Sequence, residues 1–194
     1  MKLFLCSVAL LAIFCLCGCM IQWPWGKKDP LPTVKGIPNY FCLDPVNRIY
    51  RGGQPKDESG WKYLLSLGVT NVVKLNTVKE GSDAVAQSLN MRVQYFPIDL
   101  DDQIVYLPEK YLDKIVSAIT PGTFIHCGSD ARTRSAFDRR FDLAGGQDRT
   151  GIACAAYRLR VMGWPEPLVR AELFRFGFHQ ELIALWRAYL DFKP

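Results

Sequence analysis

The chain has 194 residues, of which 49% are hydrophobic and 22% charged, and its formal net charge is +5. This length fits one domain with a terminal extension, and the composition is sufficient for a full hydrophobic core. The mild positive charge suits an anionic small substrate or an acidic surface, but it is too weak to indicate a nucleic-acid-binding protein. No repeat of solenoid length occurs, which excludes that class of protein.

The first residues of the chain, MKLFLCSVALLAIFCLCGCM, have the layout of a secretory signal. Lys2 makes the start cationic, and the apolar stretch over residues 3–16 is short for a membrane span. The motif LCGC at residues 16–19 resembles a bacterial lipobox, which implies cleavage before Cys19 and lipidation of that cysteine. We therefore expect a signal peptide at 1–18 and a cell-envelope lipoprotein, at the outer membrane or on the periplasmic face of a bacterium. The alternatives are a plain cleaved signal or an uncleaved anchor.

The segment after the signal reads as a tether. Residues 21–38 contain four prolines and show neither helical nor strand periodicity. We expect a lipid-anchored linker over 19–38 and a folded domain over 39–194.

Three of the seven cysteines, Cys42, Cys127 and Cys154, remain outside the export segment. This odd number leaves at least one thiol unpaired. Cys154 reads as a core residue, whereas Cys42 is either packed or a disulfide partner that protects Cys127. No CxxC pair or His/Cys cluster indicates a metal site, and we expect neither a metal nor a cofactor.

Along the folded part, short apolar strands alternate with helices before a final run of helices. The expected strands cover residues 47–55 (with a turn), 69–76, 91–99 and 122–127, and the expected helices cover 61–67, 80–90, 108–119, 150–162, a segment opened by Pro165, and 179–190. This order predicts an α/β fold with a central, mainly parallel sheet flanked by helices. Ligands of such sheets bind at the carboxyl ends of the strands, which is where Cys127 lies.

The chemistry expected at that strand end is anion binding and nucleophilic attack. The glycine-containing segment 146–151 opens a helix, and backbone N–H groups at a helix N-terminus bind anions. Arg149 adds a guanidinium that can grip a phosphate through two hydrogen bonds. In such a positive field the thiol of Cys127 is expected to ionise readily and to attack phosphorus.

The pattern His-Cys-x-x-Gly-x-x-Arg-Thr-Gly resembles the cysteine-dependent dual-specificity and tyrosine phosphatases, in a bacterial branch of that superfamily. The stretches IYRGGQP, GWKYLLSLGVTNVVKLN, GQDRTGIACAAYRLRVMGW and ELFRFGFHQEL extend the resemblance from residue 47 to about residue 190. The resemblance implies a dual-specificity-phosphatase-like fold and hydrolysis of phosphomonoesters through a cysteinyl-phosphate.

The resemblance also implies roles for individual residues. Cys127 matches the nucleophile, Arg149 the phosphate-gripping arginine, and Thr150 the hydroxyl that assists departure of the thiolate. His126 matches the residue that supports the ionised cysteine through the loop. The phosphate cradle comprises Gly146, Gln147, Asp148, Arg149 and Gly151.

The family also needs an aspartate as general acid, and three candidates follow the strand over 91–99: Asp99, Asp101 and Asp102. The spacing from Pro97 favours Asp101. The alternative is that these aspartates form only a solvated turn. Among other residues, Arg51 and Gln54 either line the rim of the site or belong to a structural turn, and His179 reads as a residue that starts a helix.

The sequence departs from the family pattern between cysteine and arginine. The family places its arginine six positions after the cysteine, whereas Arg149 lies twenty-two positions after Cys127. Removing sixteen residues between Cys127 and Gly146 restores the register. A register ending at Arg132 places the arginine one residue too close and lacks the glycine, and we reject it.

Three interpretations of this insertion, residues 128–145, remain open. The insertion can loop out while both ends keep the usual geometry, at an extra loop-closure cost of about 1 kcal/mol. It can instead disturb the loop and leave a domain that binds phosphorylated ligands without turnover, or it can reflect a variant or mis-read sequence that the fold tolerates. We favour the first, because nucleophile, arginine, threonine and candidate acid are all retained.

The expected partners are a phosphorylated small molecule or phosphoprotein and a membrane reached through the lipid, with no nucleic acid and a monomeric chain. The DRT sequence at 148–150 and the four arginines of the insertion favour inositol phosphates or phosphoinositides over a lone phosphotyrosine. Alternatively, the Asp148 carboxylate orders the arginines of the loop.

Overall fold

The structure is a computed structural model of the whole chain, and it describes residues 32–99, 106–128 and 145–192. The predicted signal peptide, the lipidation site Cys19, two of the three candidate acids and most of the insertion lie outside the described residues. In the described part of the chain, no helix has the length and apolar character needed to cross a membrane.

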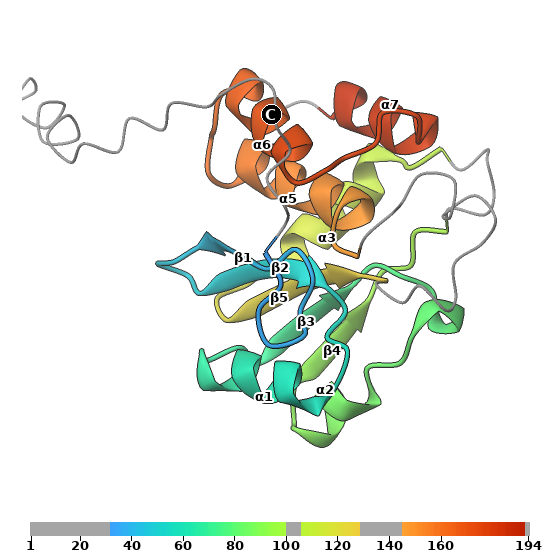
Figure 1. Cartoon of the computed structure of the whole chain (residues 1–194). Coiled ribbons are helices and arrows are strands. Elements are labelled where there is room, and N and C mark those ends of the chain that lie inside the picture. The colour runs from blue at the N-terminus through green and yellow to red at the C-terminus, as the bar shows by residue number, and fades with distance from the viewer. Residues whose placement is uncertain (1–31, 100–105, 129–144, 193–194) are drawn as a thin grey trace, which may run out of the picture.

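The core of the fold is a five-stranded sheet in the order β1-β2-β5-β3-β4 (Figure 1). The strands are β1 (Phe41–Asp44), β2 (Ile49–Gly53), β3 (Asn71–Lys74), β4 (Arg92–Tyr95) and β5 (Thr123–Cys127). All neighbours pair in parallel except β1 and β2, which are antiparallel. The predicted mainly parallel sheet is confirmed, with β5 at its centre.

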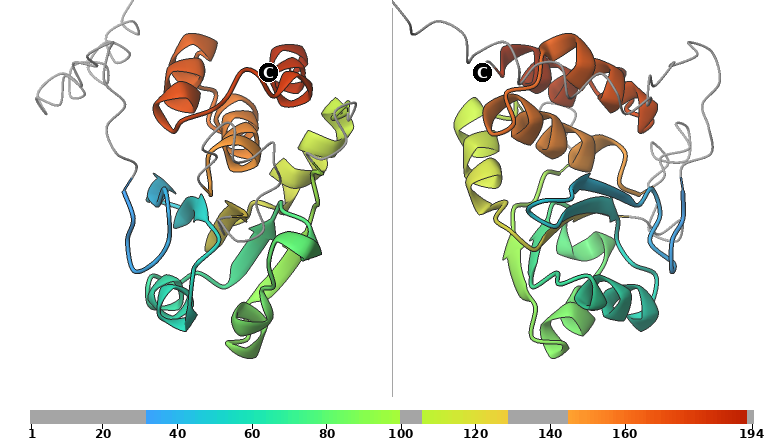
Figure 2. Two further views of the ribbon diagram at one scale, coloured as in Figure 1. Left: turned by 45° about the vertical axis from the view of Figure 1, so that its right-hand side comes forward. Right: turned by 90° about the vertical axis from the view of Figure 1, so that its left-hand side faces the viewer.

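Helices cover both faces of this sheet (Figures 1 and 2). One face carries α1 (Glu58–Ser66) and α2 (Ala84–Ser88), and the other carries α3 (Glu109–Ala118), α5 (Asp148–Arg160), α6 (Glu166–Arg175) and α7 (Ile183–Asp191). The architecture is therefore the predicted α/β sandwich.

The central strand supplies alternate residues to two separate cores. Phe124 packs in the cluster that contains Trp61 of α1, whereas Ile125 and Cys127 belong to the larger cluster beneath α3, α5, α6 and α7. Successive strand side chains point to opposite faces, so His126 faces α1 and Cys127 faces α5. This alternation places the candidate nucleophile under the N-terminus of α5.

Several element boundaries differ from the predictions. The helix expected over 80–90 is a short 3₁₀ helix, η2 (Val78–Glu80), followed by α2, because Gly81 has a φ of +155° that a helix cannot contain. The last helix begins at Ile183, so the prediction that His179 starts it is wrong. The edge strand β1 was not predicted from its sequence.

The packed part of the chain also reaches back into the predicted linker. Ile37 is fully buried in the core beside α1, and Val34 forms an antiparallel bridge with it. The end of the segment predicted as a free tether therefore contributes to the domain.

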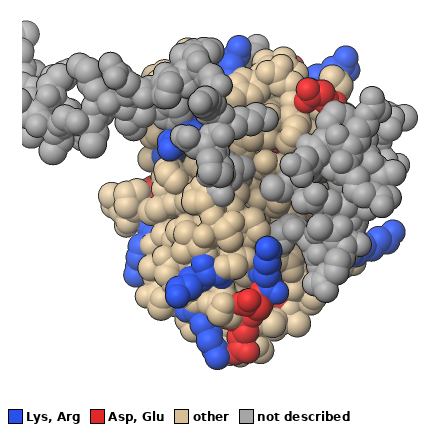
Figure 3. Space-filling view, viewed as in Figure 1, with Lys and Arg blue, Asp and Glu red and all other residues tan. Residues whose placement is uncertain are grey.

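Charged side chains are scattered on the face shown in Figure 3. Most of the blue and red groups drawn there lie over the lower part of the molecule, where Figure 1 places α1 and α2, and groups of the two signs adjoin there. The described residues on this face thus form no continuous basic stripe.

Candidate active site

The two ends of the insertion meet at the end of β5. The backbone N–H of Gly146 donates a hydrogen bond to Cys127 Sγ at 3.3 Å, although the two residues are nineteen positions apart in sequence. Gly146 thus lies against the Cys127 side chain, three positions before Arg149.

Glycines make this close approach possible. Gly146 has a φ of +84°, and a Cβ built on it would lie 2.4 Å from the backbone of both Gly52 and Gly53. A Cβ on Gly53 would lie 2.8 Å from the carbonyl carbon of Gly145. The end of β2 and the start of the cradle therefore pack backbone against backbone, and a larger residue at either place would separate them.

Arg149 lies in the first turn of α5 and is only 6% exposed. Its Nη1 donates to Glu80 Oε2 at 2.8 Å and to the Ile98 carbonyl at 3.0 Å, and its Nη2 pairs with Glu80 Oε1. These bonds use the end of the guanidinium and leave the edge formed by Nε–H and the second Nη2–H. That side edge can still grip a phosphate through two hydrogen bonds.

The pKa of Arg149 depends on both Glu80 and Cys127. Burial by itself would lower the pKa of Arg149, but its hydrogen bonds to Glu80 and its interaction with Cys127 outweigh that effect and raise the pKa. Gly128, which follows Cys127 in the chain, also lies next to Glu80 and Arg149, since a Cβ on Gly128 would lie 3.2 Å from Glu80 Oε1 and 3.5 Å from Arg149 Nη2. The Cys127 thiol and the Arg149 guanidinium therefore lie close together at the end of β5.

Glu80 is a site residue that the sequence analysis missed. Its Oε2 accepts hydrogen bonds from the backbone N of Thr77 at 2.7 Å and from Thr77 Oγ1 at 2.9 Å, which completes a capping box for η2. Burial would raise the pKa of Glu80, but the bonds from Arg149 and Thr77 hold it below its usual range. The Thr-x-x-Glu spacing was visible in the sequence as a capping signal, but the pairing with Arg149, 69 positions away, was not.

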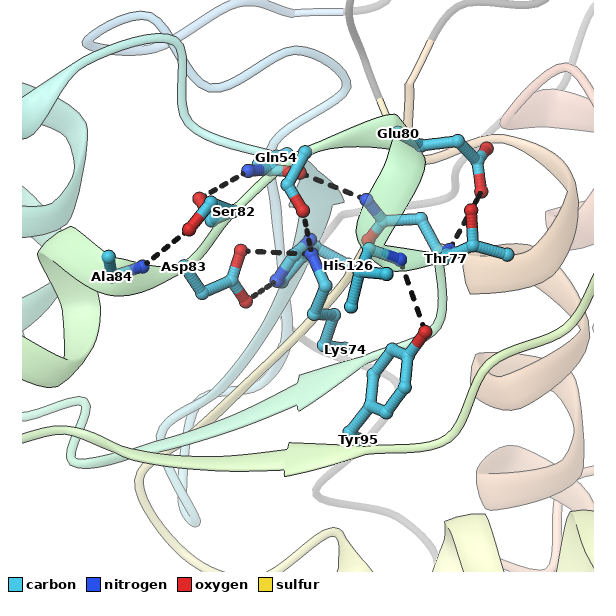
Figure 4. Close-up of polar contacts among 12 residues, drawn as sticks. Gln54, Lys74, Thr77, Glu80, Ser82, Asp83, Ala84, Tyr95 and His126 are labelled. Carbon is cyan, nitrogen blue, oxygen red and sulfur yellow. Dashed lines mark hydrogen bonds and ion pairs between the residues drawn. The ribbon is translucent and has the colours of Figure 1, made fainter.

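Behind the nucleophile, on the opposite face of β5, His126 belongs to a buried charged network (Figure 4). Its Nε2 lies 2.9 Å from Asp83 Oδ2, and Lys74 Nζ lies 3.2 Å from Asp83 Oδ1. Burial would raise the pKa of Asp83, but His126 and then Lys74 outweigh it and hold that pKa below its usual range. His126 also packs edge-on against Trp61, with ring centroids 5.7 Å apart.

The same network holds the segment 77–83, which carries Glu80, against the strand ends (Figure 4). Lys74 Nζ donates to the Gly81 carbonyl at 2.9 Å, and Gln54 Nε2 donates to the Ser82 carbonyl at 2.8 Å. The N–H of Val78 donates to the Tyr95 hydroxyl at 3.1 Å. His126 therefore supports the site by fixing the segment that positions Arg149, rather than by direct contact with Cys127.

The other predicted cradle residues have defined contacts. The Thr150 hydroxyl donates to the Gly52 carbonyl at 3.4 Å. The Asp148 carboxylate accepts the backbone N–H of His179 at 2.8 Å and lies 3.1 Å from its ring Nδ1, so it ties the loop before α7 to the cradle. Gln147 packs against Gly177, and Gly151 against Leu173.

Of the candidate general acids, only Asp99 is described, and it is exposed. Its neighbour Ile98 provides the carbonyl that binds Arg149, so the segment bearing the aspartates starts at the site. Asp101 and Asp102 lie outside the described residues.

The three cysteines of the domain are free. Burial raises the pKa of the Cys154 thiol to about 11, consistent with its prediction as a core residue. Cys42 does not form the disulfide with Cys127 that was considered as an alternative. In the part of the chain that the structure describes, no three His, Cys, Asp or Glu side chains form a cluster suited to a metal ion.

The fold matches those of solved phosphatase structures. TpbA from P. aeruginosa matches with a TM-score of 0.59 at 20% identity, over 84% of this chain and 92% of that chain. The core catalytic domain of the PP-IP phosphatase SIW14 from S. cerevisiae matches with a TM-score of 0.57 at 16% identity, over 79% and 87% of the two chains. PTPMT1 in complex with PI(5)P matches with a TM-score of 0.54 at 16% identity, over 79% and 96%.

These likenesses confirm the predicted dual-specificity-phosphatase-like fold. No protein-family model matches the sequence, and no curated protein does either.

Proposed function

We propose that this chain is a cysteine-dependent phosphatase that hydrolyses phosphomonoesters through a cysteinyl-phosphate. One observation carries the proposal: the Cys127 thiol lies beside the Gly146 N–H and the Arg149 guanidinium, although nineteen positions separate Cys127 from Gly146. A nucleophile, a backbone donor and a planar cation at one place are the parts that phosphoryl transfer requires.

In the first step of this reaction, the Cys127 thiolate attacks phosphorus while the bond to the ester oxygen breaks. The general acid gives its proton to that leaving oxygen, and Asp101 is our first candidate, with Asp99 and Asp102 as alternatives. In the second step, water attacks phosphorus, the sulfur–phosphorus bond breaks, the proton of the water passes to the aspartate, and inorganic phosphate leaves. The thiolate is thereby regenerated, with the Thr150 hydroxyl near the cradle to assist its departure.

Arg149 would hold the transferred phosphoryl group through its free side edge, while Glu80 holds the other end of the guanidinium in place. Such a fixed donor stabilises developing charge without reorganising during the reaction. Glu80 is a positioning residue in this scheme, since it acts through Arg149.

The proposal is tested with p-nitrophenyl phosphate as substrate for the full chain. We expect turnover that orthovanadate inhibits, that EDTA leaves unchanged, and that Cys127→Ser abolishes. Cys154→Ser is the matched control and should retain turnover, because this thiol is fully buried and outside the cradle. A folded protein that binds inorganic phosphate through Arg149 but hydrolyses neither aryl nor inositol phosphates would instead be a non-catalytic phosphate-binding domain.

For the physiological substrate, we propose a molecule with clustered phosphates, such as an inositol phosphate or a phosphoinositide. The solved structures of similar fold include a PP-IP phosphatase and a protein in complex with PI(5)P, although a variant of TpbA was solved in complex with pTyr. Comparing kcat/KM for inositol hexakisphosphate, phosphoinositide vesicles and a phosphotyrosine peptide tests this preference. A higher value for the peptide would contradict it.

We also propose that the protein is exported and anchored to a bacterial cell envelope by a lipid on Cys19. The support is the signal layout of the first residues and the lipobox-like LCGC motif. The expected result is that Cys19→Ala moves the protein from the membrane fraction to the soluble fraction or leaves the signal uncleaved. Unchanged processing and membrane recovery would contradict the lipid anchor.

A further inference from the structure

Arg51 is a buried cation directly beneath the phosphate cradle. It lies in the middle of β2, is only 1% exposed, and its Nη2 donates to the Gly146 carbonyl at 2.5 Å. The Asn39 side chain donates to the same carbonyl at 2.9 Å. Two buried donors from different parts of the chain therefore hold one cradle carbonyl.

The charge of Arg51 has no anionic partner in the described part of the chain. Its guanidinium carbon lies over the face of the Phe176 ring, 4.1 Å from the ring centroid. Its Nε–H has no hydrogen-bond partner among the described residues. A buried charge without a counter-ion is strongly destabilising, so proteins rarely keep one. An arginine retained in this state indicates an anion that binds close to it.

The geometry of the cradle shows where that anion would lie. The carbonyl and N–H of one trans peptide point in opposite directions, and the described chain has no cis peptide. Because Arg51 and Asn39 hold the Gly146 carbonyl on their side, the N–H of Gln147 in the same peptide points away from them. The preceding N–H, that of Gly146, already points at Cys127 Sγ.

From these contacts we infer that Arg51 is a second positioning cation of the anion site, a role that rests on the proposed function. It keeps the Gly146 carbonyl oxygen away from the bound phosphoryl group and thereby directs the cradle N–H groups toward it. The positive charge of its guanidinium, which has no anionic partner among the described residues, further stabilises the bound phosphoryl group. From its sequence, Arg51 was expected to be a rim residue or part of a structural turn, but its burial excludes the rim.

The test measures binding of inorganic phosphate by calorimetry in a Cys127→Ser background, so that it does not depend on turnover. Arg51→Met keeps an unbranched chain that replaces the aliphatic stem and removes the guanidinium charge, and we expect the dissociation constant to rise about tenfold or more. Arg175→Met is the matched control, because Arg175 lies on the same Phe176 ring, 5.9 Å from its centroid, but is exposed. The control should bind phosphate as the parent protein does.

Turnover supplies a second measurement, because added guanidinium ion would not rescue a variant in which Arg51 had only a structural role. In the otherwise native chain, Arg51→Ala should lose turnover of p-nitrophenyl phosphate, and added guanidinium ion at non-denaturing concentration should restore part of it. If Arg51→Met does not fold, Arg51→Lys takes its place, because it keeps the charge but not the forked donor. Arg51→Lys should then bind phosphate several-fold more weakly.

The outcomes separate this inference from the proposed function. If the parent chain shows no turnover but loses phosphate affinity on Arg51→Met, the proposed enzyme fails and the role of Arg51 stands. If a folded Arg51→Met or Arg51→Lys variant binds phosphate as tightly as the parent, the inference is wrong. A loss of thermal stability with unchanged phosphate affinity would show that Arg51 is only structural, which also overturns it.

Discussion

The pairing of Glu80 with Arg149 occupies the terminal nitrogens of the guanidinium and leaves its side edge for the proposed substrate. Glu80 holds both terminal nitrogens, and its own carboxylate is fixed by Thr77. An arginine released from this pair would sample other orientations, and misplacement of a catalytic group by about 1 Å can reduce rates about a hundredfold. Glu80 therefore has a role in alignment that its charge alone would not suggest.

We predict that Glu80→Gln lowers kcat/KM for p-nitrophenyl phosphate about a hundredfold while the fold is kept. Steady-state kinetics together with circular dichroism measure this change. Glu58→Gln is a suitable control, since Glu58 forms an exposed ion pair with Lys62 at 2.8 Å and lies outside the site. Equal kinetics for the two variants would show that Glu80 does not align Arg149.

The buried carboxylate of Asp83 gives a prediction about stability and pH. Its pKa is lowered in the folded state, so the stability that it contributes is present above its unfolded pKa, about 3.9, and is lost as the pH falls through the folded value. We expect Asp83→Asn to reduce the free energy of unfolding by about 3 kcal/mol at pH 7, because it leaves His126 and Lys74 without their partner.

Urea unfolding at several pH values measures this effect. The difference between parent and Asp83→Asn should shrink as the pH falls from about 4, where the carboxylate of the unfolded chain becomes protonated, through the lower pKa of Asp83 in the folded state. Asp113→Asn, at an ion pair of 3.4 Å on the surface, should change stability by less than about 0.5 kcal/mol. A difference for Asp83→Asn that stays constant down to acidic pH would contradict the ionic role.

At the scale of elements, the contact between β2 and the cradle depends on residues without side chains. Gly146 and Gly163 both have left-handed backbone conformations, with φ of +84° and +63°. They differ in their surroundings, because a Cβ on Gly163 would meet nothing within 4 Å whereas one on Gly146 would overlap the backbone of β2. The pair therefore separates conformational strain from steric overlap.

We predict that Gly163→Ala costs only about 1 kcal/mol of stability from backbone strain. Gly146→Ala should cost at least about 3 kcal/mol, because overpacking adds to the strain, and it should abolish turnover. Thermal melts and the p-nitrophenyl phosphate assay distinguish the two. Similar losses for both variants would show that β2 and the cradle are not in tight contact.

At the scale of the whole molecule, the insertion is the feature that separates this chain from the family pattern. Of the described residues on its two sides, Gly128 lies beside Glu80 and Arg149, and Gly145 lies against Gly53 of β2.

We predict that deletion of residues 129–144, which joins Gly128 directly to Gly145, leaves the protein folded. Loop-closure entropy changes by only about 1 kcal/mol over this range of loop lengths, so stability should change by a similar amount. Inorganic phosphate binding should persist, and any change in preference between inositol hexakisphosphate and p-nitrophenyl phosphate would measure what the insertion adds. Loss of both the fold and phosphate binding would show that the insertion is needed to form the cradle.

Much of this architecture could be predicted from local pattern. The sheet was predicted from the alternation of strands and helices. Cys127 and Arg149 were placed at the carboxyl ends of its strands from the apolar strand over 122–127 and the glycine-rich start of the next helix. These predictions succeed because the periodicity of apolar residues and the conformational freedom of glycine act over a few neighbouring residues. The boundaries of the helices were predicted less accurately. Gly81 lies between η2 and α2, where one helix was expected, and Asp148 binds His179 before α7 begins.

The partners of the site were decided only by the tertiary structure. Glu80 reaches Arg149 across 69 positions, and Arg51 reaches the Gly146 carbonyl across 95. From the sequence, Arg51 was expected at the rim of the site or in a structural turn, and Glu80 at the start of a helix. Contacts of this kind arise when parallel strands bring their carboxyl ends to one edge of the sheet, and no short-range pattern records which side chains meet there.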